Sequence, residues 1–292
     1  MKDLVSLLLF VSSFSVLAGD KIDKTIDASP DGLVEIHNTR GEISISGWDK
    51  SQVSVKGTLD DLAESFVFET TGSKTIVKVK LPRNTNFRSR DGSKLTINVP
   101  KGAKVSFSGV ATDLKINTIM KGVDINSVSG DVTLSDIKGR TYINNVSGEL
   151  SLNNIEGSLE VSTVSGDVKA KVNSNKIVLS GVSAELNIET NQIDSATVST
   201  VSGDAFITGA LNSSGEVKMS SVSAEAVFFV RGELNATVAI ETAPGGDIVN
   251  QYSEDKPKTS FINSQNLQFT SGDGTGAVRM TTVSGEVGIK VK

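Results

Sequence analysis

The sequence predicts an all-β protein, a β-solenoid whose coils have about 18 residues. A turn tetrapeptide, Val-Ser-Gly or Val-Ser-Ala followed by Asp or Glu, recurs first at steps of 18 residues and then of 19 and 21. Its copies begin at Val128, Val146, Val164, Val182, Val201, Val222 and Val283. A fixed short period is typical of stacked identical units, and such a stack organises surface rather than a buried reaction chamber.

Each coil divides into two units of nine residues, because glycines recur at that spacing from Gly130 to Gly166. Three apolar columns follow the same step. The first contains Val132, Leu150, Leu159, Val168, Ile177 and Leu186, the second Leu134, Ile143, Leu152, Val161, Leu179 and Ile188, and the third Val128, Ile137, Val146, Ile155, Val164 and Val182. The first two columns are two residues apart and therefore share one face of a strand. We expect each following turn to insert the third column into the same core.

Stacking is what makes such short units stable. A strand of four or five residues buries too little surface to offset an ordering entropy of roughly 1–2 kcal/mol per residue. Coils about 4.8 Å apart pair their backbone groups with the coils above and below, and align like side chains into a continuous core. Two strands per coil is the simpler arrangement, and a three-sided coil is the alternative.

The chain divides into three parts. Residues 1–18 are predicted to be a secretory signal peptide, because an apolar run ends in Val16-Leu17-Ala18 before charged residues, with cleavage after Ala18. Residues 19–108 read as irregularly spaced strands, an N-terminal β region or cap over the end of the stack. Residues 109–292 carry the solenoid repeats, and the register is lost in an excursion near 243–277.

Composition narrows the location and the partners. The chain has no Cys, which excludes disulfides, thiolate metal ligands and an acylated lipoprotein anchor. The net charge of −5 argues against nucleic acid and anionic lipid as partners. After signal cleavage no segment is long and apolar enough for a transmembrane helix. We therefore expect an exported protein that is periplasmic, or secreted to the cell surface.

Three phrases of the sequence resemble one family. The opening phrase runs from Glu35 to Asp49, the middle one is Leu95-Thr96-Ile97-Asn98-Val99-Pro100-Lys101-Gly102-Ala103, and the closing one runs from Gly274 to Val287. They are similar to the bacterial β-strand-repeat putative adhesins, the domain of unknown function 4097, over about residues 30–292. The resemblance implies a right-handed β-helix-like fold at a bacterial envelope, and it brings no catalytic residues.

Groups that could carry catalysis are sparse. His37 is the single histidine, and its place in an alternating strand favours a structural or surface role. Without Cys, and with one His, ordinary zinc sites are excluded, and a Ser-His-Asp triad would have to be built around His37. The serines of the Val-Ser-Gly turns are expected to bond local backbone. We predict that the protein is not an enzyme and requires no cofactor.

Two polar columns are candidate binding features. An acidic column is formed by Asp131, Glu149, Asp167, Glu185, Asp204 and Glu225. Stacked carboxylates repel one another, so calcium is conceivable, but the Gly-Gly-x-Gly-x-Asp pattern of calcium-binding nonapeptide arrays is absent, and solvated acids are the favoured interpretation. A polar ladder at nine-residue steps is expected to join coils through hydrogen bonds; it comprises Asn126-Ser127, Ser135-Asp136, Asn144-Asn145, Asn153-Asn154 and Ser162-Thr163.

These observations favour an adhesin-like or structural interaction module that contacts an envelope polymer or protein through its long face. Parallel β-helices also host polysaccharide lyases and hydrolases, so a polysaccharide-acting enzyme is one alternative. A scaffold that stacks end to end is another, and flat, uncapped terminal coils would favour it. Trp48, Tyr142 and Tyr252 do not suggest a stacking platform for sugars.

Overall fold

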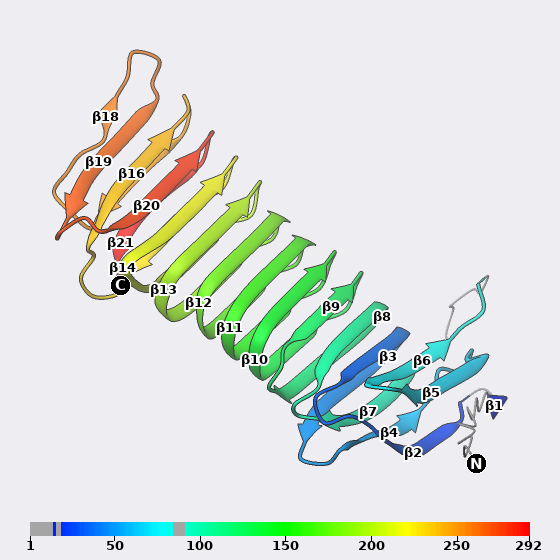
Figure 1. Ribbon diagram of the computed structural model, residues 1–292. Helices are drawn as coiled ribbons and strands as arrows, with labels where there is room; N and C mark the ends of the chain where they lie inside the picture. The colour runs from blue at the N-terminus through cyan, green and yellow to red at the C-terminus, as the bar shows by residue number, and fades with distance from the viewer. Residues whose placement is uncertain (1–13, 16–18, 84–90) are drawn as a thin grey trace, which may run out of the picture.

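The computed structural model describes residues 14–15, 19–83 and 91–292, and these parts of the chain consist of strands and turns without a helix (Figure 1). The strands stack one above the next into an elongated body of two layers, with the N-terminal strands at one end and the C-terminal strands at the other. Among the described residues, then, no helix is available that could span a bilayer.

The middle of the chain forms the most regular part of the stack. Its strands are β10 (Val132–Asn145), β11 (Leu150–Ser165), β12 (Val168–Ser183), β13 (Leu186–Thr200) and β14 (Ala205–Ser221). Neighbouring strands are parallel, and Val132 lies beside Leu150, Leu150 beside Val168, and Val168 beside Leu186. These register steps equal the first steps of the turn tetrapeptide. The predicted β-solenoid is therefore confirmed.

Each coil contributes one segment to each of two layers that enclose a single core. In β11, Leu150 and Leu152 line the inner side of the first layer, and Leu159 and Val161 line that of the second. All four are at most 1% exposed, so the first two predicted columns form the core. We call the layers face 1 and face 2, in the order in which β11 enters them. The coil has two sides, as in the simpler of the predicted arrangements.

Two corners connect the faces. The Ile corner, which includes Ile119, Ile137 and Ile155, leads from face 1 to face 2 within a coil. The Val corner is the turn tetrapeptide, and it leads from face 2 to face 1 of the next coil. The expectation that both corners insert an apolar residue into the core is wrong for the Val corner. The isoleucines are fully buried, whereas Val146 and Val164 are 44% and 47% exposed.

Backbone conformation explains this difference. At the Ile corner, Asn154 has φ of 51°, in the left-handed region, and this breaks the alternation of the strand so that Ile155 turns inward. At the Val corner the alternation continues. Asn145 points inward, where its amide donates a hydrogen bond to the carbonyl of Ser147 at 3.0 Å, and the next residue, Val146, points outward.

Toward the N-terminus the chain order of the coils is exchanged. β3 (Leu33–Trp48) pairs on one side with β8 (Lys104–Ile119) and on the other with β6 (Lys74–Lys80) and β7 (Ser93–Pro100). β9 (Val123–Ser127) lies between β8 and β10 on face 2. β4 (Gln52–Thr58) and β5 (Ser65–Thr71) then run antiparallel to β7 and β6, and β2 (Lys21–Asp27) runs antiparallel to β4. Antiparallel strands thus cover this end.

The short strand β1 (Phe14–Ser15) pairs with β5. The rest of the predicted signal peptide, 1–18, lies outside the described residues, and its cleavage stays a prediction.

The C-terminal end contains a second exchange of order. The chain passes from β15 (Ala226–Val230) to β16 (Ala236–Thr242) and β17 (Asp247–Gln251), then through β18 (Lys258–Thr259) and β19 (Gln265–Ser271) to β20 (Gly276–Thr282) and β21 (Glu286–Val291). The last two strands return and lie between earlier ones: β20 separates β14 from β16, and β21 separates β15 from β17. β19 runs antiparallel along β16 and covers face 2 at this end. The segment 243–277 therefore includes a coil segment and this cover.

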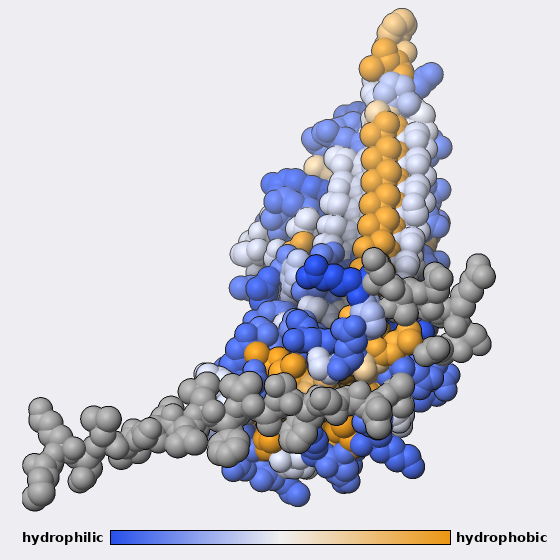
Figure 2. Space-filling view, turned by 90° about the vertical axis from the view of Figure 1, so that its right-hand side faces the viewer, coloured by the Kyte–Doolittle hydropathy of each residue, from blue (hydrophilic) through white to orange (hydrophobic). Residues whose placement is uncertain are grey.

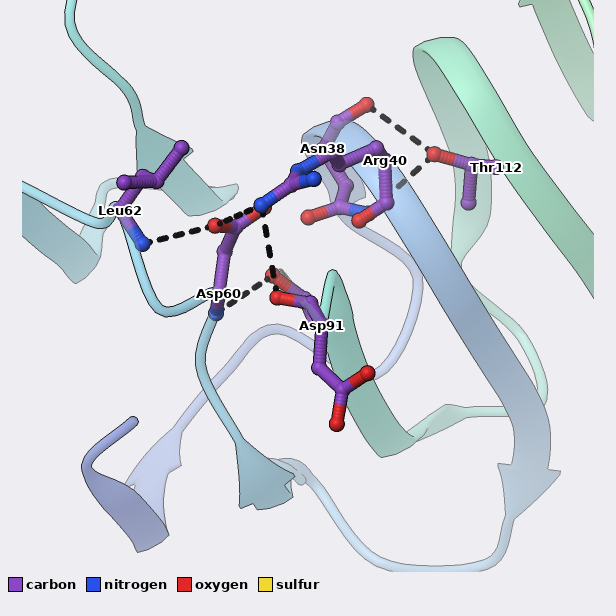
Figure 3. Close-up of polar contacts among 7 residues, drawn as sticks. Asn38, Arg40, Asp60, Leu62, Asp91 and Thr112 are labelled. Atoms are coloured by element: carbon purple, nitrogen blue, oxygen red, sulfur yellow. Dashed lines mark hydrogen bonds and ion pairs between the residues drawn. The ribbon is translucent and has the colours of Figure 1, made fainter. Parts of the chain in front are cut away.

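A buried ion pair fastens the N-terminal strands to the stack (Figure 3). Arg40 of β3 contacts the carboxylate of Asp60 through Nε at 2.6 Å and Nη2 at 2.8 Å, and the Asp60 side chain is 1% exposed. This hydrogen bonding raises the pKa of Arg40 above its usual value. Asp60 also accepts the backbone N–H of Leu62, and Asn38 donates to Thr112 Oγ1 in β8 at 3.2 Å. The contacts join three segments that are distant in sequence.

Candidate binding face

Two columns of outward side chains run along face 1. Because side chains alternate along a strand, the residues between the buried ones point to solvent. In β8, β10, β11 and β12 the columns consist of Lys115 and Asn117, Thr133 and Ser135, Ser151 and Asn153, and Lys169 and Lys171. The strand register stacks them in this order. Face 1 therefore presents a continuous track of hydroxyl, amide and ammonium groups.

A hollow of about 530 Å³ lies on this track where β7, β3, β8 and β10 are neighbours. Lys94 and Lys115 line it together with Glu42, Asp113 and Asp131. Such a mixture of cationic and anionic groups can hydrogen-bond to a polar ligand as both donor and acceptor.

Two further hollows follow along the same face. One of about 260 Å³ is lined by Lys169, Lys171 and Asn187, and one of about 340 Å³ by Asn173 and Arg231. Lys171 also lines the second hollow, so the two are adjacent. Hollows spaced along one face fit an extended ligand better than a compact one.

An aromatic pair lies near the C-terminal end of the track. The rings of Phe206 and Phe229 are 6.3 Å apart between centroids and inclined at 45°. The ammonium of Lys292 lies 5.8 Å from the centroid of the Phe229 ring. Sequence reasoning considered Trp and Tyr and missed this pair. Extending the coil step of 21 residues would have placed Phe206 beside Val227, two residues from Phe229.

The predicted acidic column lies where the Val corner leads into face 1, and its Asp and Glu members have different contacts. Asp131 Oδ1 accepts the backbone N–H of Glu149 at 2.9 Å, and Asp204 Oδ1 accepts that of Glu225 at 2.9 Å. Asp167 does the same toward Glu185 at 3.4 Å. The short Asp side chain reaches the next coil, which an identical turn at every level makes possible.

The Glu members instead reach sideways to cations. Glu149 pairs with Lys169 at 2.8 Å, and Glu225 pairs with Lys290 at 3.4 Å. The hydrogen bond to Glu149 raises the pKa of Lys169 above its usual value. No group of three His, Asp or Glu side chains that could hold a metal ion occurs in the described part of the chain. The carboxylates are thus spread along the stack and bonded to protein groups.

The predicted polar ladder separates into two kinds of contact. At the Ile corner, Asn154 donates to Asp136 at 2.6 Å, and Asn173 donates to Asn154 at 2.9 Å. At the Val corner the inward residues Asn145 and Thr163 instead bond to the carbonyls of their own turns, Thr163 to Ser165 at 3.1 Å. Both kinds are structural.

His37 lies on the outer side of face 2. Its Nε2 is 3.6 Å from Glu35 Oε2, and its side chain is 36% exposed. Glu35 is also bound by Lys74, whose hydrogen bond lowers the pKa of that carboxyl. The histidine is therefore distant in the fold from the hollows of face 1, on which no residue of its strand segment lies.

Comparison with known proteins gives the class. The family described as Toastrack DUF4097 matches residues 33–242, which is more than half of the chain. The chain belongs to this family. No curated protein matches it.

Three solved structures are similar to the chain at 12% identity. A putative cell adhesion protein from Clostridium sporogenes covers 94% of this chain and 100% of its own, with a TM-score of 0.28. A putative lipid binding protein from Parabacteroides distasonis covers 94% and 98%, with a TM-score of 0.43. A putative adhesin from Bacteroides fragilis covers 92% and 97%, with a TM-score of 0.40.

Proposed function

We propose that the protein is an exported, adhesin-like interaction module that binds an extended polar polymer of the cell envelope along face 1. The observation that carries the proposal is the continuous polar track with its successive hollows, from Lys94 and Lys115 to Lys171 and Arg231. A polymer lying across several coils meets the same kinds of group repeatedly, so many weak contacts add up.

The proposal includes a binding role without catalysis. Membership of the Toastrack DUF4097 family supports an envelope module. The Ser hydroxyls of the Val corner are used structurally: those of Ser147 and Ser165 donate to the carbonyls of Val128 and Val146. A hydroxyl held in this way, with no histidine near it, is poorly placed to act as a nucleophile.

Self-stacking end to end is disfavoured by the way the stack ends. β4 and β5 cover the N-terminal end in antiparallel orientation, and β19 covers face 2 at the C-terminal end. Irregular, covered ends are a common protection against edge-to-edge association.

A glycan array tests the ligand class. We expect the purified protein to bind one class of envelope polysaccharide, and binding to weaken at least several-fold for Lys169→Ala with Lys171→Ala, since both line hollows on face 1. Lys218→Ala is the matched control. Lys218 is paired with Glu216 on face 2, as Lys169 is with Glu149 on face 1, and is similarly exposed.

Equal loss in the control, or no polysaccharide bound at all, would contradict the proposal. Export is tested separately by fractionating the producing cells. A periplasmic or surface protein whose intact mass begins at Gly19 is expected. A full-length protein confined to the cytoplasm would remove the envelope role.

A further inference from the structure

The Val corners form an exposed apolar column along the edge between the two faces. Eight valines belong to it, each 43–51% exposed: Val110, Val128, Val146, Val164, Val182, Val201, Val222 and Val283. We call this column the valine ladder. Figure 2 shows it as an orange stripe between two pale columns. Single exposed valines are ordinary, but a contiguous stripe of this length on a soluble surface is not.

The return of the last coil keeps the valine ladder continuous. Val283 follows Val222 in space although 61 residues separate them in sequence, because Ser284 donates its backbone N–H to the carbonyl of Val222 at 2.9 Å. The ladder ends at Ala243 in the outermost coil and at Thr39 beside Val110. An insertion into the stack thus carries the same residue at the same corner.

The columns that flank the valine ladder carry no charge. On the face 2 side they are Ser108, Asn126, Asn144, Ser162, Ser180, Ser199, Ser220 and Thr281, and on the other side Ala111 and the serines of the turns. Most of these turn hydroxyls already donate to the valine carbonyl of the preceding coil, for example Ser202 to Val182 at 3.2 Å. Removing water from the band therefore leaves few polar groups unpaired.

The band is also rigid and of a definite size. Each rung is held by the backbone hydrogen bond from Ser to the preceding Val, as between Ser147 and Val128 at 2.9 Å. Eight rungs at about 4.8 Å give a length of roughly 34 Å, and three columns give a width of roughly 10 Å. Two such bands in contact would bury about 700 Å² in total, which is in the range of weak, transient association.

We propose that the valine ladder is the contact through which two copies of this protein form a weak dimer. The repeat spacing carries the choice of partner, because only a surface with the same rise can match every rung over the whole length. A symmetric pair uses the same patch on both copies and closes. An anionic lipid surface is a poorer partner, since the band has no cationic residues and the chain has a net charge of −5.

The acidic column sets the relative direction of the two copies. Asp131, Glu149 and Asp167 lie on one side of the valine ladder only, three residues after each valine. A two-fold axis parallel to the ladder places the acidic column of one copy opposite the other flank of its partner, whereas antiparallel ladders would place acid against acid. The two copies therefore run in the same direction. This arrangement leaves face 1 free on both, so it is independent of the proposed polymer binding.

Sedimentation velocity tests the dimer. We expect the purified protein to shift from monomer to dimer across a concentration series that reaches the millimolar range, and Val146→Lys with Val182→Lys to remain monomeric throughout. Val178→Lys is the matched control, because Val178 is 45% exposed but stacks between Glu160 and Thr197 on face 2. A parent that stays monomeric, or a control that dissociates equally, would overturn the proposal. Val146→Thr with Val182→Thr gives the same comparison with less perturbation of folding.

Cysteine cross-linking tests the direction, and the absence of native Cys makes it clean. Under mild oxidation, Val128→Cys is expected to give a disulfide-linked dimer, because in a same-direction pair each rung meets its own counterpart. Val178→Cys is expected to stay monomeric. An opposite-direction pair would link at rungs near the centre of the ladder, such as Val164, and not at Val128. That result would overturn the assigned direction, and no link at any rung would overturn the contact itself.

Discussion

The two corners of each coil have the same nine-residue spacing and the same glycine two residues on, yet they bury opposite kinds of residue. Ile155 is fully buried, and Val146 and Val164 are nearly half exposed. One left-handed residue, such as Asn154, decides which side of the wall the next side chain takes. A sequence period therefore fixes how far apart equivalent residues lie, whereas local backbone conformation fixes where they point.

The largest effect is expected in the wall that both corners share. Leu152→Asp should lower the free energy of unfolding by more than the roughly 2–5 kcal/mol lost when a buried Leu is trimmed to Ala, because it also buries a carboxylate. Ser151→Asp, beside it on the outer side, should be tolerated. Thermal melting followed by circular dichroism measures both. A Leu152 variant that melts like the parent would contradict the inward assignment.

The comparison between the corners is tested within one coil. Ile155→Ala should cost roughly 2–5 kcal/mol, because it leaves a cavity. Val164→Ala should change stability by less than about 0.5 kcal/mol, because its side chain is already in solvent. Chemical denaturation at a dilution where the protein is monomeric gives both values. Similar losses at the two sites would mean that the corners are equivalent after all.

The residue that makes the corners different offers a smaller effect. Asn154→Ala should cost about 1–2 kcal/mol, because it places an alanine at positive φ and removes hydrogen bonds to Asp136 and Asn173. Asn144→Ala, at an exposed position of the preceding coil, is the control and should have little effect. Equal melting of the two variants would show that the left-handed residue is not what turns Ile155 inward.

The smallest expected effect concerns ions at the acidic column beside the Val corner. Because Asp131 and Asp167 each accept a backbone N–H of the next coil, calcium should change the melting temperature no more than magnesium at equal ionic strength. A specific site would add about 2.7 kcal/mol at a hundredfold excess of ligand over Kd. A calcium-selective rise that disappears in Asp131→Asn with Asp167→Asn would contradict this expectation.

Much of the fold was predictable, since the columns that contain Leu152 and Val161 have the two-residue spacing of a strand face and occupy the core. The outward turn of Val146 was not predictable, because Asn145 and Asn154 precede their corner residues alike, and only the left-handed backbone of Asn154 separates them. The place of β20 and β21 inside the stack was equally hidden, because return of the chain to an earlier level leaves the repeat pattern unchanged.

The candidate binding face was less predictable than the core. Residues such as Lys115, Lys169 and Arg231 show no common spacing in sequence, and they meet only because the coil steps change from 18 to 19 and 21 residues. The ion pair of Arg40 with Asp60 likewise depends on a long-range contact that no local pattern indicates.

Native-state labelling of single cysteines tests the difference between the corners most directly, because the chain has no Cys of its own. Measured at a dilution where sedimentation shows monomer, Val146→Cys should react with a maleimide at nearly the rate of the unfolded chain. Ile155→Cys should be protected until the protein unfolds. Protection at both positions would place Val146 in the core, and equal reactivity at both would show that Ile155 is not buried; either result would contradict the account.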